Sequence, residues 1–101
     1  MQEQAPLAET PIGVVTHYWS HLGVAGVHLT APLDVGDHIH IHGHTSDLEQ
    51  RVGSMEYDHR PIPHAEPDLD IGIAVAEHVR EHDTVYRAID PADVGEDEMM
   101  L

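Results

Sequence analysis

Apolar and other residues alternate in short runs along most of this chain. Within residues 24–30, Ala25, Val27 and Leu29 fall on every second position, and the same period recurs over residues 38–43. A period of two is typical of a strand, whose successive side chains point to opposite faces of a sheet. No segment shows a sustained apolar stripe with the 3.6-residue spacing of a helix. The pattern therefore predicts an all-β protein.

Six such runs are separated by Gly, Pro and Asp. They are residues 12–19, 24–30, 38–43, 48–57, a run through Ile71, Ile73 and Val75, and residues 84–89. Gly36 provides the positive φ needed for the turn before the third run, and a β-bulge is expected at Gly53, where the alternation slips. Pro61, Pro63 and Pro67 lack a backbone donor, which predicts an irregular crossing loop. About six strands on one small core indicate a single antiparallel β-barrel, whose closure removes exposed edges.

The length of 101 residues leaves room for one hydrophobic core. We assign residues 12–89 to the β-barrel domain, residues 1–11 to a flexible tail and residues 90–101 to an acidic flexible tail, because neither end shows periodicity. The absence of cysteine excludes disulfides and thiolate zinc sites. No apolar stretch approaches the roughly 20 residues of a membrane span. We therefore expect a cytoplasmic protein without membrane association.

The charge is strongly unbalanced, with 19 acidic residues against four arginines, no lysine and a formal net charge of −15. An acidic surface can bind a basic partner, or it can reflect adaptation to high salt, where charges are screened over roughly 3 Å at 1 M. We favour the halophilic interpretation, under which an RNA partner is not excluded. The 11 histidines add a second titration, because an unperturbed imidazole becomes charged as the pH falls through about 6.5.

Several segments, taken in order, resemble a known family. They are IGVVTHY at 12–18, LDVGD at 33–37, IHIHGHTSD at 39–47, VGSMEYDH at 52–59 and VREHDTVY at 79–86. This arrangement resembles the β-barrel found as the second domain of elongation factor Tu and other translational GTPases, and small stand-alone translation elongation factor-like proteins. The family's glycines near Asp68 and at the turn occupied by His82 are replaced here, and Asp and His tolerate a left-handed backbone better than most residues. The resemblance implies an elongation factor Tu domain 2-like barrel.

The same resemblance implies a non-catalytic accessory domain that docks to a protein or RNA of the translation apparatus. The residues that match the family's motifs best are the expected partner-binding residues: His40, His44, Thr45, Asp47, Ser54 and His59. For Thr45 and Asp47 an equal alternative is a turn closed by bonds from side chain to backbone. GTP binding is excluded, because the chain has no G-x-x-x-x-G-K-[ST] loop and no lysine to complete one.

A different function is suggested by the alternation of His38, His40, His42 and His44 with two isoleucines. Period two places these imidazoles on one face of a strand. Histidines two apart can bind Zn²⁺ when a neighbouring strand adds further ligands. The alternative function is therefore a histidine-rich zinc-binding protein. In the competing interpretation the isoleucines fill the core and the histidines form an ordinary solvated face.

We expect no catalytic residues and no enzymatic activity. Ser20, Ser46 and Ser54 lie among many histidines and aspartates, but no G-x-S-x-G elbow, H-E-x-x-H helix or glycine-rich cofactor loop is present. Tyr18 and Trp19 could provide a stacking platform for a base, although in a chain this poor in aromatics they are more often core or barrel-mouth residues. The oligomeric state is left open by the sequence.

Overall fold

The computed structural model describes residues 9–88, and all of its regular structure is β. The strands are β1 (Thr10–Trp19), β2 (Val24–Leu29), β3 (Leu33–Asp34), β4 (His38–His42), β5 (Asp47–Arg51), β6 (Met55–Tyr57), β7 (Arg60–Ile62), β8 (His64–Ala65), β9 (Asp70–Ala74) and β10 (Thr84–Arg87). The expected acidic tail, residues 90–101, and most of the expected tail at residues 1–11 lie outside the described residues. Residues 9–88 contain no helix, so this part of the chain has no helix that could cross a membrane.

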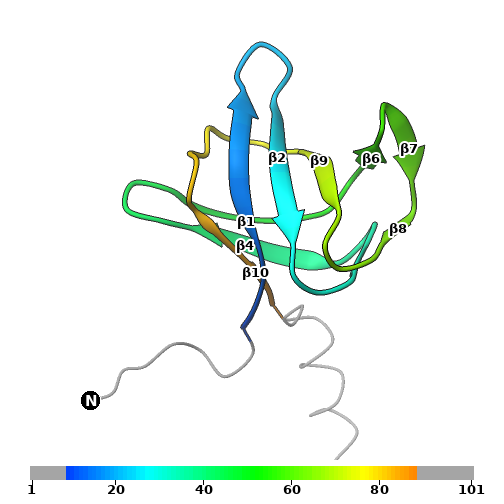
Figure 1. Ribbon diagram of the computed structural model, residues 1–101. Helices are drawn as coiled ribbons and strands as arrows, with labels where there is room; N and C mark the ends of the chain where they lie inside the picture. The colour runs from blue at the N-terminus through cyan, green and yellow to red at the C-terminus, as the bar shows by residue number, and fades with distance from the viewer. Residues whose placement is uncertain (1–8, 89–101) are drawn as a thin grey trace, which may run out of the picture.

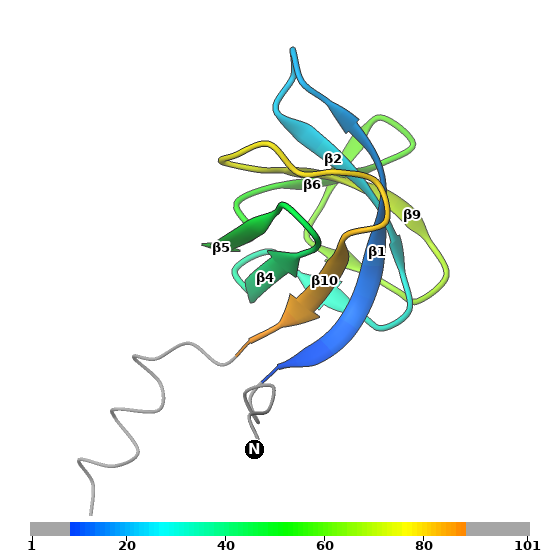
Figure 2. The same ribbon diagram turned by 90° about the vertical axis from the view of Figure 1, so that its left-hand side faces the viewer.

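Eight strands form one antiparallel sheet in the order β5-β4-β10-β1-β2-β9-β6-β7, and β3 pairs with β8. The sheet curls, so that β4 and β10 run across the direction of β1 and β2 (Figures 1 and 2). The Gln50 side chain fastens β5 to the end of β9: its Nε2 donates to the Ala74 carbonyl at 2.9 Å, and its Oε1 accepts from the Ala76 amide at 2.8 Å. The result is an all-β antiparallel half-barrel.

The core consists of the inward-facing aliphatic residues of the sheet. Ala25, Val27 and Leu29 of β2 and Ile39 and Ile41 of β4 are all 0% exposed, which confirms the predicted alternation. Burial of such side chains contributes about 1.5–3 kcal/mol each. No aromatic ring belongs to the fully buried core of the described residues. The fold therefore depends on close packing of branched aliphatic side chains.

The predicted single strand over residues 48–57 is wrong. The structure breaks it into β5 and β6, with Gly53 in the connection between them. A bulge would keep both halves on one partner, but β5 pairs with β4 whereas β6 pairs with β9 and β7. The chain leaves the β4–β5 ladder at Val52, whose amide donates a 2.8 Å hydrogen bond to the carbonyl of Asp37 in the loop before β4.

The proline-rich segment was also predicted wrongly as irregular. It contains β7 and β8, so residues 9–88 form ten strands and not about six. Pro61 is accommodated because β7 is the last strand of the sheet, where one side needs no ladder donor. His64 and Ala65 pair only with β3. Strands of two or three residues carry too little alternation to be read from a sequence.

Left-handed backbone occurs where the sequence suggested it. Gly36 has φ of 99°, as expected of the turn before β4. Asp68 (φ 73°) and His82 (φ 78°) adopt the same region without glycine, which confirms the expected local adjustment. Asp58 and His59, at φ 54° and 64°, are a further left-handed pair that the sequence did not indicate. They form the turn between β6 and β7.

Candidate functional site

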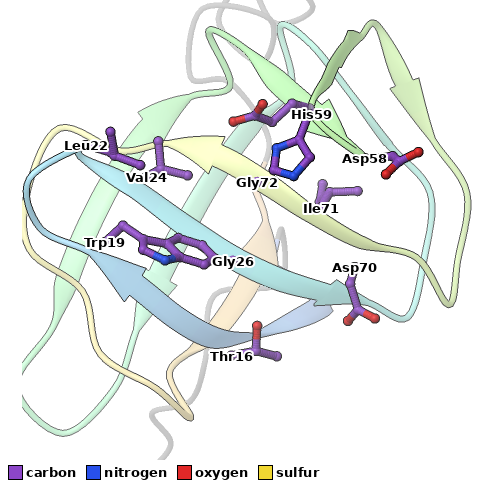
Figure 3. A pocket seen from close by; sticks show the side chains of 11 residues that line it. Thr16, Trp19, Leu22, Val24, Gly26, Asp58, His59, Asp70, Ile71 and Gly72 are labelled. Atoms are coloured by element: carbon purple, nitrogen blue, oxygen red, sulfur yellow. The ribbon is translucent and has the colours of Figure 1, made fainter.

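A groove of about 400 Å³ lies on the outer face of the sheet, where β1, β2, β9 and β6 run side by side (Figure 3). Its floor is formed by Gly26 of β2 and Gly72 of β9, which are directly opposite each other in the ladder. Their neighbours Val27 and Ile71 are buried in the core, so the two glycines face outward. Because neither glycine carries an outward side chain, neighbouring side chains pack over this part of the sheet: Gly26 is buried, and Gly72 is partly exposed. We call this feature the Gly26–Gly72 groove.

One wall of the groove is the indole of Trp19. A Cβ built on Gly26 would lie 3.2 and 3.3 Å from the ring carbons Cζ3 and Cη2, so the ring rests directly on this glycine. Trp19 is nevertheless 39% exposed, and Leu22 beside it is 63% exposed. Figure 3 shows the indole lying along β2 next to Gly26, with Leu22 and Val24 at the end of the same strand pair.

Trp19 is therefore not a core residue, which was one of the two placements expected for it, and a bulge in β1 explains its outward position. The register between β1 and β2 shifts between Val15 and His17. Val15 points into the core, and strict alternation would also turn Trp19 inward. The extra residue reverses the phase, so Tyr18 packs against the core and Trp19 faces outward.

The opposite wall and the rim are acidic. Glu56 of β6 pairs with Gly72, and a Cβ on that glycine would lie 3.3 Å from the Glu56 Cγ and 3.6 Å from its Oε2. Asp58 and His59 come from the left-handed turn after β6, and Asp70 begins β9. Asp70 accepts a 2.9 Å hydrogen bond from His28. Within the described residues no ion pair or hydrogen bond engages the carboxylate of Glu56 or Asp58.

The predicted partner-binding residues are not brought together on one surface. His40 and Asp47 face each other across the β4–β5 hairpin, with 2.6 Å between His40 Nε2 and Asp47 Oδ1. The carboxylate of Asp47 therefore contacts a side chain of the neighbouring strand. His44 and Thr45 lie in the turn of this hairpin, Ser54 lies in the connection between β5 and β6, and His59 lines the Gly26–Gly72 groove. Their role in binding stays a prediction.

The β4–β5 hairpin, residues 38–51, is a region of satisfied charges, and His40 is its centre. His40 Nδ1 lies 2.7 Å from Glu9 Oε2, its Nε2 is bonded to Asp47, and the side chain is 15% exposed. Burial opposes the charged imidazole, but the hydrogen bonds to Asp47 and Glu9 outweigh it and raise the pKa of His40. The hydrogen bond from His40 in turn lowers the pKa of Asp47. His38 Nε2 lies 3.7 Å from Glu49 Oε1.

The four histidines expected to bind zinc do not form one ligand set. Strand β4 ends at His42, so His44 lies beyond the strand, in the turn. His40 and His42 have ring centroids 5.5 Å apart, and both nitrogens of His40 already contact carboxylates. Among residues 9–88, the possible ligand atoms that come within 4.8 Å of one another belong to Glu9, His40 and Glu49. Zinc as a cofactor stays a prediction.

The sequence did not indicate a second imidazole that, like that of His40, lies between two carboxylates. His64 Nδ1 lies 2.6 Å from Asp34 Oδ1, and its Nε2 lies 2.5 Å from Glu66 Oε2. Hydrogen bonds to Glu66 and Asp34 raise the pKa of His64. The spacing of His64 and Glu66, two apart, was a visible signal. The contact with Asp34 depends on the pairing of β3 with β8, which sequence did not predict.

Comparison with known proteins gives two kinds of match, whereas no family model matches the sequence. An uncharacterized protease of Methanocaldococcus jannaschii is 34% identical over 76 residues, which cover 74% of this chain and 19% of that protein. Two crystal structures of the C-terminal domain of a Geobacillus thermoleovorans protein described as a U32 peptidase have TM-scores of 0.74 and 0.72, at 16% and 17% identity. The matches cover 77% and 78% of this chain and 99% and 91% of those domains.

These matches correct the functional expectations. The proteins similar to this chain are a protease and a U32 peptidase domain. The resemblance to a translation elongation factor-like protein is therefore wrong. The two functions predicted from the sequence, a translation-factor accessory domain and a histidine-rich zinc-binding protein, are wrong as well. The expectation of no enzymatic activity is corrected by the same match, because the similar protein is named as a protease, of which this chain spans 19% of the length. Segments such as LDVGD at 33–37 do not distinguish the translation-factor barrel from other folds, because a tight turn before a strand needs those residue types in many small β folds.

Proposed function

We propose that this chain is the half-barrel module of a U32-type peptidase and that it contributes to peptide-bond hydrolysis by binding polypeptide. The observation that carries the proposal is the 34% identity over 76 residues with a protein named as a protease. The chain corresponds to 19% of that protein's length, so we assign the hydrolytic activity to a larger assembly that includes this module. Its likeness to the C-terminal domain of a U32 peptidase supports the same placement.

The Gly26–Gly72 groove supports polypeptide as the bound molecule. It is open and shallow and runs over the outer face of four strands, which suits an extended chain better than an enclosed small molecule. Its walls offer an exposed indole and aliphatic side chains on one side and carboxylates on the other. Such a surface can contact both the apolar and the polar groups of an unfolded segment.

A domain exchange tests this function. Three forms of the Geobacillus thermoleovorans peptidase are compared: the intact protein, a form without its C-terminal domain, and a form in which this chain replaces that domain. The rate of cleavage of fluorescently labelled casein is measured for each. We expect deletion to lower the rate and this chain to restore it, because the module holds substrate for the catalytic part.

Fluorescence anisotropy of labelled casein with the isolated 101-residue chain provides a second readout that does not depend on cleavage. Saturable binding is expected. The proposal is contradicted if the exchanged form cleaves no faster than the deleted form while the intact peptidase does, or if this chain leaves casein anisotropy unchanged.

A further inference from the structure

We propose that the Gly26–Gly72 groove binds the side chain of an arginine carried by an extended polypeptide. This inference deepens the proposed function by naming the class of segment that the module holds. It depends on three features of the groove, namely its floor, its aromatic wall and its unneutralised carboxylates. Each feature fits a guanidinium better than other side chains.

The floor is accessible at Gly72 and covered at Gly26, since Gly72 is partly exposed whereas Gly26 is buried beneath the Trp19 ring. Facing residues of neighbouring strands have Cβ atoms about 4.5–5.5 Å apart, and here both outward Cβ atoms are absent at Gly26 and Gly72. Trp19 approaches the floor from the β1 side and Glu56 from the β6 side. A flat group can therefore lie over Gly72, beside the indole and next to the Glu56 carboxylate.

The aromatic wall is the indole of Trp19, which stays 39% exposed although the His17 ring packs against it with 4.4 Å between the ring centroids. A guanidinium stacks on an indole through cation–π attraction, and tryptophan is the best partner for this contact. Leu22 and Val24 extend the wall with aliphatic surface. The methylene stem of an arginine would pack along these side chains while its head reaches the floor.

The carboxylates supply the complementary charge. Glu56, Asp58 and Asp70 line the groove, and in the described part of the chain the first two have no ion-pair partner. The chain as a whole has a formal net charge of −15, so its surface attracts cations and repels phosphate. Arginine combines stacking with a forked hydrogen bond to a carboxylate, whereas lysine offers only a point charge.

Binding can be observed directly, because Trp19 is the only tryptophan of the chain. The probes are the blocked tripeptide acetyl-Gly-Arg-Gly-amide and its citrulline analogue, which keeps the shape of arginine but has no charge. Titration into the 101-residue chain at low salt is followed by tryptophan fluorescence and by calorimetry. We expect saturable binding of the arginine peptide and binding at least about tenfold weaker for the citrulline peptide, since a charge-assisted contact is lost.

Three variants locate the site. Glu56→Gln removes one wall charge, and Gly72→Val fills the floor; each should weaken the arginine peptide by about tenfold. Glu77→Gln is the matched control, because Glu77 is an exposed acid outside the groove and the change in net charge is the same. Its affinity should stay within about twofold of the original. Circular dichroism verifies folding, and Glu56→Gln alone still tests the site if Gly72→Val does not fold.

Several outcomes would overturn the assignment. They are equal affinity for the arginine and citrulline peptides, equal weakening by Glu77→Gln and Glu56→Gln, preferential binding of a uridine oligonucleotide, or a self-association in sedimentation velocity that shields Trp19. The domain exchange separates this inference from the proposed function. If this chain restores casein cleavage while the arginine peptide does not bind, the peptidase role stands and the arginine site is rejected. If the peptide binds but cleavage is not restored, the site stands and the peptidase role is rejected.

Discussion

The β4–β5 hairpin and the Gly26–Gly72 groove differ in how their polar groups are used. The hairpin concentrates histidines and acids, and several of them pair with acids, as in the bonds of His40 to Glu9 and Asp47 and the contact of His38 with Glu49. The groove has fewer such residues, and the carboxylate of Glu56 has no partner in the described part of the chain. The capacity to bind a ligand therefore follows from the groups that folding leaves unpaired and not from the local density of reactive residues.

The largest expected difference concerns one glycine from each region. A Cβ on Gly43, in the hairpin turn, would lie 1.8 Å from Asp83 Oδ1, whereas a Cβ on Gly72 meets nothing closer than 3.3 Å. Asp83 is 4% exposed and accepts a 2.9 Å hydrogen bond from the Arg80 amide. We expect Gly43→Ala to lower the free energy of unfolding by about 3 kcal/mol through overpacking and loss of this bond.

In contrast, Gly72→Ala should change the free energy of unfolding by no more than about 0.5 kcal/mol, because glycine is itself unfavourable in a strand. Urea denaturation followed by circular dichroism measures both variants. Equal losses at the two positions would mean that the groove floor is packed as tightly as the hairpin turn, and the contrast between the regions would fail.

The second prediction concerns the bridge between the two regions. Gln50 of β5 makes two hydrogen bonds to the backbone at the end of β9, at the Ala74 carbonyl and the Ala76 amide. We expect Gln50→Ala to lower the free energy of unfolding by about 2 kcal/mol, since both backbone groups lose their partner. The same denaturation measurement is used. Gln50→Glu keeps the acceptor for Ala76 and should lose only part of this stability; a full loss in both variants would contradict the two-bond interpretation.

The predictable part of the fold was the part governed by local alternation. The burial of Ala25, Val27 and Leu29, and of the β4 isoleucines, follows from period two. The left-handed backbone at Asp68 and His82 was expected only because the resembled family has glycines there, and residue type alone did not indicate Asp58 and His59. The break at Gly53 was not predictable in this way. Whether a slipping pattern is a bulge or a change of partner depends on which distant strand pairs with β6.

The groove was less predictable for the same reason. Gly26 and Gly72 lie far apart in sequence, and only the register of β2 with β9 places them side by side. The outward position of Trp19 depends on the bulge after Val15, which reverses the alternation. Histidines attracted attention in the sequence because they are numerous, whereas a missing side chain gives a signal only when its neighbours in space are known.

The third prediction uses the raised pKa of His40, which makes stability depend on pH. Below the unfolded-state value, near 6.5, the imidazole is charged in both states, and the contacts with Glu9 and Asp47 contribute fully. This contribution is lost as the pH rises through the higher folded-state pKa. We expect the unfolding temperature of the original chain to fall by a few degrees more than that of His40→Gln between pH 6 and about pH 9.

Thermal unfolding across this pH range provides the test for His40. His44→Gln is the control, because His44 is an exposed histidine of the same hairpin, and its pH profile should follow that of the original chain. The pKa of His64 is raised as well, but that side chain is 44% exposed, so His64→Gln should change the profile less. Superimposable profiles for His40→Gln and the original chain would show that the His40 imidazole does not form its contacts with Glu9 and Asp47 in solution.

The smallest effect is expected from removing one acid in each region. Asp47→Asn should lower the unfolding temperature near pH 6, because the bond to His40 lowers the pKa of Asp47 and therefore stabilises the folded state above its unfolded value of 3.8. Glu56→Gln should leave the unfolding temperature unchanged or raise it slightly at low salt, since Glu56 lines the groove together with Asp58 and Asp70 in a chain of net charge −15. Molar KCl should remove that slight gain, because screening then acts over roughly 3 Å. Differential scanning calorimetry at low and molar KCl measures both variants. A clear loss of stability in Glu56→Gln at low salt would mean that this carboxylate has a structural partner, and the groove would then be as satisfied as the hairpin.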